Sequence, residues 1–497
     1  MHTLAVLGPA LLLSAALAVS VVKAAAPTPG ASPMNDFACD LYKQFAKAKP
    51  GENLFFSPYS IETALAMTAE GARGITATEM LAVLHTPDKL DPLHATLGEL
   101  AARLAGKPVP EEMRAKIKTM RDELDALNKE LEANHKYDDE TMRKMRRSEE
   151  LARQLNELLK TVDQFEFKSA NALWVEQTFQ VEKPYLDKIA RLYSTGGAFP
   201  IDFRQNYEPA RAKINAWIAS QTNDRIKDLL AKGQVDQSTR LVLTNAVYFK
   251  GEWTDPFDAK ETKNEPFTLL DRSTQTVPLM RSAEIKGTAY AAFNGDGSPF
   301  STPRRVPLDK RSFDDCYPDA GGFTVLQLPY KGDALSMIVL LPRSGDALTK
   351  LEQKLSGDGL ATWLAALDAR KVDVSLPRFK LETSYDLVDA LQALGMRRAF
   401  IDPAKPDSAE FDGISSSSDP RQRLFIGVAV HKAFLDVNEK GTEAAAATAI
   451  GMAAGSAMPR DVPFTPVFRA DHPFLLIIRD NATNTALFMG RVTSPAK

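Results

Sequence analysis

The feature that most constrains the fold is a set of apolar runs, rich in β-branched and aromatic residues, that begins near Phe165. Four of them are bounded by turn-forming residues, as strands are: residues 169–175, 241–249, 323–328 and 335–341. Residues 424–437 and 474–491 are predicted to close the chain as strands, the second broken by a hairpin turn at 480–484. Helical spacing occurs at residues 36–50, 60–84 (with Ser60 as a candidate cap), 214–222 and 386–394. Since helices and strands do not alternate regularly, the sequence predicts an α+β architecture.

Residues 107–160 differ abruptly from the rest of the chain, because charges of both signs dominate there. Apolar residues recur in heptad-like steps of three and four: Ile117, Met120, Leu124, Leu127 and Leu131, then Met142, Met145, Leu151, Leu155, Leu158 and Val162. A polar stretch at residues 133–139 interrupts them. We therefore expect an inserted helical hairpin with coiled-coil-like contacts between its arms. The basic cluster of Arg143, Lys144, Arg146 and Arg147 is interpreted as a solvated helix face, with an anion-binding site as the alternative.

The N-terminus has the pattern of a signal peptide. An apolar run at residues 11–22 is too short to span a bilayer comfortably, and the alanines at 24–26 suit cleavage. We expect residues 1–25 to be removed, residues 26–35 to be flexible, and the protein to be secreted or extracytoplasmic; an uncleaved anchor is the alternative. Export would permit a disulfide between Cys39 and Cys316, but a large core does not require one, and two independent thiols are favoured.

Composition and motifs argue against several functions. The net charge of -3 lacks the basic imprint of proteins that bind nucleic acids or anionic membranes. No Gly-x-Ser-x-Gly, His-Glu-x-x-His or Gly-x-x-x-x-Gly-Lys motif occurs, so no catalytic residue is predicted. The histidines beyond the signal peptide are not spaced as metal ligands, so no metal or cofactor is expected: His85, His94, His135, His431 and His472. His431 lies in a strand pattern and is interpreted as a buried core histidine.

The stretch most informative about function is residues 439–450, EKGTEAAAATAI. Its alanines favour a helix by propensity, yet residues 444–449 offer no apolar stripe to bury. Small side chains would equally suit a strand that slides between neighbours. Farther on, Pro459, Pro463 and Pro466 argue against a central strand, because proline cannot donate to the ladder. From these residues alone, a surface linker and a mobile strand are equal alternatives.

Several separated stretches, taken in order, resemble the serpin family. They are residues 53–61 (NLFFSPYSI), 169–174 (SANALW), 243–253 (LTNAVYFKGEW), 431–433 (HKA) leading into 437–443 (VNEKGTE), and 468–475 (FRADHPFL). The resemblance covers residues 36–106 and 161–497, and leaves the hairpin at 107–160 and a Gly-, Pro- and Ser-rich loop at 287–321 as insertions. It implies one α+β domain over residues 36–497, with three β-sheets, about eight or nine helices and an exposed reactive-centre loop near the C-terminus.

The resemblance also implies which residues act. The hinge of the reactive loop would consist of Glu439, Gly441, Thr442, Glu443, Ala444, Ala445, Ala446, Ala447 and Thr448. Family spacing places the reactive bond between Gly455 and Ser456, with Ala454, Ala457 and Met458 as alternatives. The region where the main sheet opens is matched by Ser57, Asn171, Asn245 and His431, and the aromatic residue at its top by Trp253. A purely structural role for these five is equally compatible with the sequence.

By this resemblance the protein is expected to be no enzyme but an irreversible suicide-substrate inhibitor of an extracellular serine protease, acting by cleavage of the loop and its insertion into the main sheet. The alternatives are a non-inhibitory carrier, chaperone or binding protein, and an added docking role for the hairpin. Non-inhibitory relatives often have bulky, charged or proline-containing hinges, unlike this one. A small residue before the bond favours an elastase-like or subtilisin-like target, with a cysteine protease as the remaining option. A monomer without stable membrane association is expected.

Overall fold

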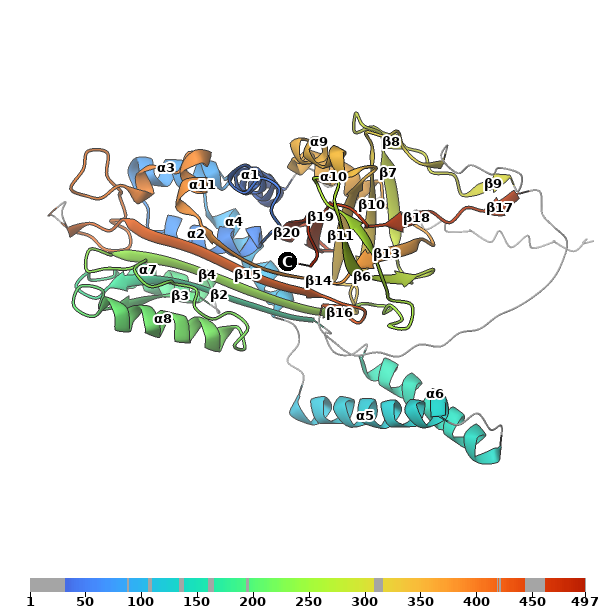
Figure 1. Ribbon diagram of the computed structural model, residues 1–497. Helices are drawn as coiled ribbons and strands as arrows, with labels where there is room; N and C mark the ends of the chain where they lie inside the picture. The colour runs from blue at the N-terminus through green and yellow to red at the C-terminus, as the bar shows by residue number, and fades with distance from the viewer. Residues whose placement is uncertain are drawn as a thin grey trace, which may run out of the picture.

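The computed structural model describes residues 32–86, 89–105, 110–133, 138–159, 165–193, 196–307, 316–417, 419, 422–442 and 461–496. These residues form three β-sheets, a two-stranded ribbon and eleven α-helices, which agrees with the predicted α+β class. Figure 1 shows how these elements are arranged. The helices are α1 (Pro33–Ala48), α2 (Pro58–Ala69), α3 (Gly74–Val83), α4 (Asp91–Leu104), α5 (Glu111–Ala133), α6 (Asp139–Leu159), α7 (Lys183–Leu192), α8 (Tyr207–Gln221), α9 (Leu348–Gln353), α10 (Gly357–Ala365) and α11 (Val388–Leu394).

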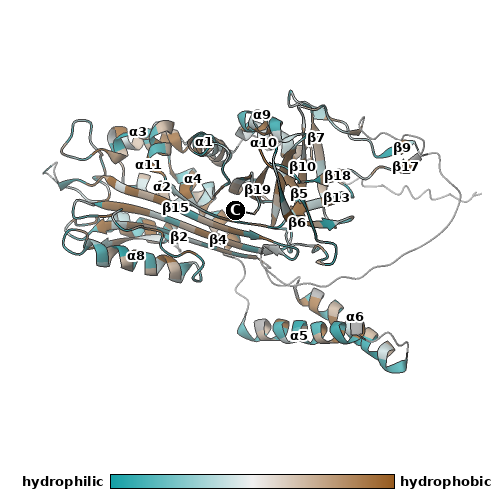
Figure 2. Ribbon diagram, viewed as in Figure 1, coloured by the Kyte–Doolittle hydropathy of each residue, from teal (hydrophilic) through white to brown (hydrophobic). Residues whose placement is uncertain are grey.

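The main sheet has the strand order β14–β15–β4–β2–β3, with the short strand β16 paired to β4. Its strands are β14 (Phe379–Asp386), β15 (Ile426–Val437), β4 (Leu241–Glu252), β2 (Phe165–Glu176), β3 (Gly196–Ile201) and β16 (Gly441–Thr442). The sheet is covered on both faces: Leu243 and Val247 of β4 belong to the large core with α2, and Val242 and Ala246 pack in a second core with α8. This double burial explains why β4 is mainly apolar and largely brown in Figure 2, although Thr244 and Asn245 lie near its centre.

Two further sheets lie beside the main one. The second sheet comprises β1 (Leu54–Phe56), β20 (Ala486–Val492), β19 (Phe474–Asp480), β11 (Leu335–Pro342), β10 (Phe323–Pro329), β7 (Ala289–Phe293) and β12 (Asp368–Ala369) in this order, with β8 (Pro299–Phe300) on β7. The third sheet comprises β18 (Val467–Arg469), β13 (Asp373–Pro377), β6 (Thr274–Ser282) and β5 (Lys263–Thr268). The ribbon pairs β9 (Arg305–Pro307) with β17 (Asp461–Pro463).

The helix predicted over residues 60–84 is wrong in two respects. Ser57, not Ser60, is the N-cap: its side chain accepts the Ser60 backbone N–H at 3.1 Å, and Pro58 occupies the first turn. The segment is also split into α2 and α3. A Cβ at Gly71 would lie 2.1 Å from Ile414 Cγ1, so the chain turns here to let a distant loop approach.

The inserted hairpin consists of α5 and α6, which pack on each other through Met120, Leu151 and Leu155 together with smaller contributions from Ile117, Leu124, Leu127 and Leu158. Met142 and Met145 are 47% and 39% exposed, so the prediction that they continue this seam is wrong. The basic cluster is partly neutralised, since Arg147 pairs with Glu123 at 2.8 Å and Lys144 with Glu130 at 3.0 Å. These contacts favour the solvated-face interpretation.

The loop predicted at residues 287–321 contains β7, a fully buried strand of the second sheet, as well as β8 and β9. The sequence AYAAF lacks the alternation that marks half-buried strands, because both faces are covered. Cys39 and Cys316 are both buried and unpaired. None of the helices within the described ranges combines the length and apolarity needed to cross a membrane.

Candidate functional site

The main sheet is parallel at one central junction, where β15 lies directly against β4. The two strands are matched from Ile426 opposite Leu241 to Phe434 opposite Tyr248. On their outer sides, β14 and β2 pair antiparallel with them. A further strand entering between β4 and β15 would therefore run antiparallel to both and could form two complete ladders.

The chain that leaves β15 turns back onto the end of β4. Gly441 has φ +140°, and a Cβ there would lie 2.1 Å from the carbonyl oxygen of Gly251, so only glycine fits. Asn438 closes the turn, its N–H donating to Gly441 O at 2.9 Å. Gly441 and Thr442, as β16, then pair antiparallel with Glu252 and Gly251. Gly441 and Thr442 thus lie on β4 in the direction that an inserted strand requires.

Glu439 anchors this turn. This residue is 5% exposed, and its carboxylate accepts hydrogen bonds from Thr262 Oγ1 at 2.5 Å and Arg378 Nε at 2.6 Å. Its backbone carbonyl accepts the Phe257 N–H at 2.8 Å. Burial alone would raise the pKa of Glu439, but the bonds from Arg378 and Thr262 together hold it below its ordinary value. The carboxylate therefore stays ionised and holds the turn between β15 and β16 in place.

Trp253 lies against the same turn and is bonded to it. Its buried indole stacks on Tyr330 with ring centroids 4.6 Å apart, and its Nε1–H donates to Asn438 O at 3.0 Å. Its backbone N–H donates to Lys440 O at 3.0 Å. The end of β4 and the turn after β15 are therefore joined by side-chain and backbone bonds.

A buried polar cluster bridges α2 and the β4–β15 junction. Asn245 donates through Nδ2 to Ser60 Oγ at 2.7 Å and to Asn171, and its Oδ1 meets His431 Nδ1. His431 Nε2 accepts the Ser57 N–H at 3.1 Å, so its proton is on Nδ1. Asn245 and His431 are direct neighbours in the register of β4 and β15. Separating these strands would break this pair, and the amide and imidazole would have to find new partners.

The family follows from this geometry together with known relatives. A family model described as serpin (serine protease inhibitor) matches residues 32–495. The chain is a serpin. Human serpin B3 is 35% identical over 461 residues, covering 92% of this chain and 97% of its own length. The horse leukocyte elastase inhibitor is 32% identical with the same coverage. The structure of uncleaved ovalbumin superposes with a TM-score of 0.68 at 27% identity, covering 94% of this chain and 99% of ovalbumin.

The serpin fold inferred from the resemblance is confirmed: three sheets are present, and the hairpin supplies two of the eleven described helices. Ser57, Asn171, Asn245 and His431 meet in one cluster, and Trp253 lies at the turn between β15 and β16. The remaining predicted hinge residues, Glu443, Ala444, Ala445, Ala446, Ala447 and Thr448, lie outside the described residues. So do Ala454, Gly455, Ser456, Ala457 and Met458, and the reactive bond stays a prediction.

The sequence did not reveal several residues that hydrogen-bond to the polar cluster and to Glu439 in this serpin. Ser60 completes the cluster, and its spacing of three from Ser57 on a helix was an available signal. Thr262 and Arg378, which hold Glu439, carry no local signal, because they approach it only through the fold.

His431 makes the stability of this serpin depend on pH. Burial lowers its pKa from 6.5 to about 3, so the unfolded chain takes up a proton near pH 6.5 that the folded chain takes up only near pH 3. The contribution of neutral His431 to the free energy of unfolding is therefore fully present above about pH 6.5, and it is lost as the pH falls from 6.5 toward 3. Lowering the pH from 7 to 5 should therefore reduce the free energy of unfolding by about 2 kcal/mol through His431.

Urea unfolding at pH 7 and pH 5 measures this loss, with His431→Gln as the comparison. The variant should lose about 2 kcal/mol less over the same interval. Equal losses in both proteins would show that His431 does not carry the pH dependence.

Proposed function

We propose that this serpin is a suicide-substrate inhibitor of an extracellular serine protease. The protease nucleophile attacks the carbonyl of the residue before the reactive bond, the peptide bond breaks, and an acyl ester joins the enzyme to the loop. The freed strand then enters between β4 and β15. The observation that carries the proposal is β16, because it already pairs with β4 in the antiparallel sense of the inserted strand, next to a closed parallel junction.

The register of β16 supports insertion of the alanine run. Thr442 is opposite Gly251. Residues directly opposite in a ladder share a face, so successive steps would place Ala444, Ala446 and Thr448 on the core side, as period-two alternation predicts for the inserted strand. Ile450 would join this face, while Glu443, Ala445, Ala447 and Ala449 would face the other side. Small side chains on the core face would enter beneath α2 without overpacking.

Insertion also accounts for irreversible inhibition. From Gly441 to the predicted bond at Gly455, a strand at about 3.3 Å per residue would drag the tethered protease about 45 Å. Each new ladder bond adds on the order of 1 kcal/mol net. A displacement of about 1 Å at a catalytic centre costs about 100-fold in rate, so the acyl ester would not be hydrolysed.

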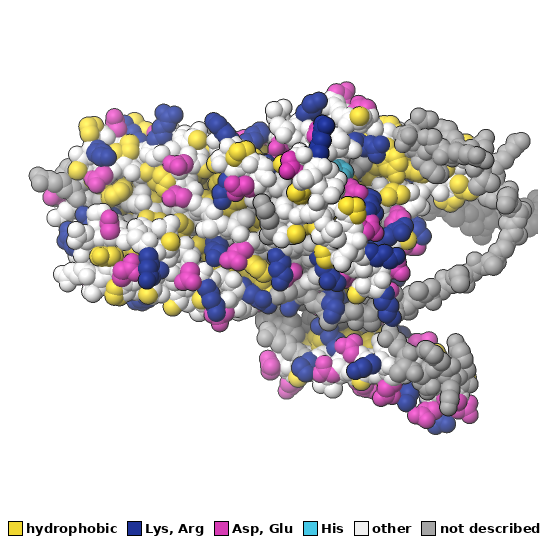
Figure 3. All heavy atoms as spheres, viewed as in Figure 1, with side chains coloured by type: hydrophobic (Ala, Val, Ile, Leu, Met, Phe, Trp, Pro, Cys, Tyr) yellow, Lys and Arg dark blue, Asp and Glu magenta, His cyan; other side chains and the backbone are white. Residues whose placement is uncertain are grey.

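The proposed target is an elastase-like or subtilisin-like protease. Gly or Ala before the bond suits a small binding pocket, and one relative is named as an inhibitor of leukocyte elastase. Cysteine proteases are the second class to test. We further propose that the protein is secreted, on the basis of the N-terminal signal pattern, and that it acts as a monomer. Figure 3 shows both signs of charge interspersed over the face it presents, as suits a protein that does not bind nucleic acid.

The alternative is a non-inhibitory serpin that carries or chaperones a ligand. A panel of elastase-like, subtilisin-like, trypsin-like and papain-like proteases separates the two, read by denaturing gel and intact mass. An inhibitor gives a covalent adduct that survives denaturation, and the mass of the released peptide locates the bond. Cleavage without an adduct by every protease would favour the carrier.

The hairpin is expected to be dispensable for inhibition, because it packs mainly on itself. It contacts the hinge region through Arg121, 3.4 Å from Glu252, but Glu252 also binds Lys331 at 2.8 Å. The ion pair is partly exposed and worth under about 1 kcal/mol. Replacing residues 107–160 with a short Gly-Ser linker should leave the ratio of adduct to cleaved product within about twofold, and Arg121→Ala should match it. A larger fall in both variants would assign the hairpin a role in insertion.

A further inference from the structure

The ribbon formed by β9 and β17 lies outside the third sheet and joins two distant segments of the chain. β17 follows the reactive loop and β9 belongs to the loop after β7. Val462 lies opposite Val306, and the Phe464 N–H donates to Arg304 O at 2.9 Å. In Figure 1 the ribbon lies beyond β18, well away from β16. Three-residue strands hold each other weakly, so something else must fix the ribbon.

A small core of its own fixes it. Val306, Cys316 and Phe464 are buried together, with Val462 and Tyr317 packed against them. Tyr317 stands edge-on to Phe464, with ring centroids 5.9 Å apart.

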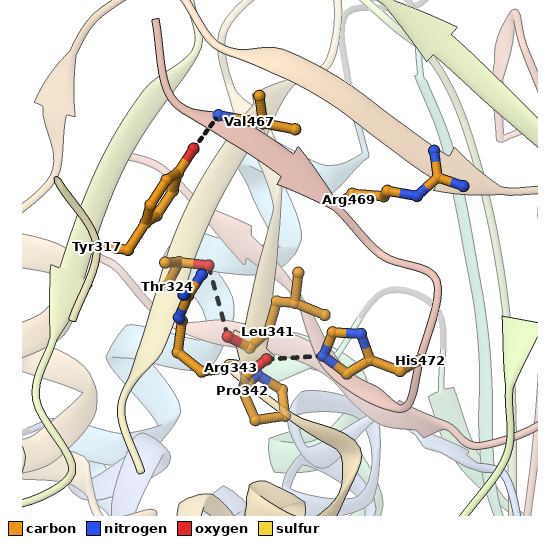
Figure 4. A pocket seen from close by; sticks show the side chains of 8 residues that line it. All are labelled: Tyr317, Thr324, Leu341, Pro342, Arg343, Val467, Arg469 and His472. Carbon is orange, nitrogen blue, oxygen red and sulfur yellow. Dashed lines mark hydrogen bonds between the residues drawn. The ribbon is translucent and has the colours of Figure 1, made fainter. Parts of the chain in front are cut away.

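Tyr317 also ties the ribbon to the body of the protein. Its hydroxyl accepts the Val467 N–H at 2.8 Å, and the Arg343 guanidinium lies 4.8 Å from its ring centroid. Figure 4 shows the Tyr317 hydroxyl directed at the backbone nitrogen of Val467. Val467 begins β18, which pairs with β13 in the third sheet. The chain is therefore fixed from Asp461 onward, well before the third sheet begins.

This attachment limits how far an uncut loop could insert. Continuing the register of β16 places residue 452 opposite Leu241, the first residue of β4, ten steps or about 33 Å from Thr442. From residue 452 to Asp461 the chain has nine steps, which reach at most about 32 Å. An uncut chain would have to return along the whole inserted length and then cross to the ribbon, so it is too short. With the ribbon released, the fifteen steps to Val467 reach about 50 Å.

We propose that the β9–β17 ribbon is a clamp that keeps the intact reactive loop out of the main sheet, so that full insertion must await cleavage. The inference rests on the proposed insertion of the loop between β4 and β15. The loop after β7 then has a function, because it holds residues 461–463 and so leaves an uncut chain too short for full insertion. A protease that cuts the loop removes the constraint at once, because the inserted strand is then no longer joined to β17.

The first test lengthens the chain without touching the clamp. Six Gly and Ser residues inserted after Arg460 add as much free chain as the attachment of residues 461–466 removes. Lengthening a loop in this way costs little stability. The same six residues inserted between Asn134 and His135, in the segment that joins α5 to α6, are the control. Each protein is incubated below its unfolding midpoint. Uncut insertion is read as an unchanged intact mass with a raised unfolding midpoint and lost capacity to form adduct.

We expect the lengthened loop to convert at least about tenfold faster than the wild type and the control, which is about 1.4 kcal/mol in barrier height. Val306→Asp, which opens the small core, should also convert faster. Its control is Phe300→Asp in β8, which places the same charge in the same inserted loop but on a strand that pairs with β7, and which should convert no faster than the wild type. If the lengthened variant converts no faster than its control, the clamp is refuted, even if Val306→Asp fails to fold. If the wild type forms no adduct with any protease, the proposed function fails instead, and the unfolding midpoint still reports on the clamp.

Discussion

Thr442→Arg is expected to turn the protein from an inhibitor into a substrate. Thr442 pairs with Gly251, and a side chain opposite Gly251 would share the core face of the ladder. That face is crowded, since even a Cβ at Gly251 would lie 2.8 Å from both the Phe249 and the Tyr330 rings. Burying an unpaired guanidinium there would cost several kcal/mol during insertion. The acyl enzyme would then be hydrolysed before the strand could enter.

The measurement is the ratio of covalent adduct to cleaved product with a protease that the wild type traps. A barrier raised by about 3 kcal/mol slows insertion by about 100-fold, enough for hydrolysis to dominate. Glu443→Arg is the matched control, because the next residue along would face the opposite side, beside the half-buried Lys250. It should still trap the protease. Equal ratios for Thr442→Arg and the wild type would mean that this face of the hinge does not enter the sheet.

The parts of the fold that sequence predicted well are those with a strong local pattern. The long strands of the main sheet are mainly apolar because both faces of the sheet are covered, and Gly441 marks the turn from which β16 begins. The polar cluster could be placed only through the resemblance, because Asn171, Asn245 and His431 are far apart in the chain. No periodicity indicates that a lone histidine and two asparagines share one junction.

The parts that sequence could not predict depend on contacts between distant segments. The break between α2 and α3 arises because Ile414 packs where a Cβ of Gly71 would lie. The clamp depends on three-residue strands, too short to show an alternation, and on a small core assembled from Val306, Cys316 and Phe464. Arg378 reaches Glu439 only because β14 lies beside β15.

A disulfide across the central junction should abolish inhibition without preventing cleavage. Ala246 of β4 lies opposite Lys432 of β15, and adjacent strands lie about 4.8 Å apart, within reach of a disulfide. An inserted strand would separate the two positions to about 10 Å, which no disulfide spans. The native thiols should not interfere: both are buried, and burial raises the pKa of Cys39 to about 12.

The matched control uses the same position on β15. Ser384 of β14 lies opposite Lys432 on its other side, and these two strands stay neighbours whether or not the loop inserts. The pair Ser384→Cys with Lys432→Cys should therefore trap the protease equally well when oxidised and when reduced. It removes the same lysine, so any effect of losing Lys432 appears in both proteins.

The decisive measurement is adduct formation by the Ala246→Cys, Lys432→Cys protein before and after reduction. We expect cleaved product with almost no adduct in the oxidised protein, and recovery of the covalent adduct once the disulfide is reduced. If the oxidised protein forms as much adduct as the reduced one, β4 and β15 need not part, and insertion between them is not how this serpin works.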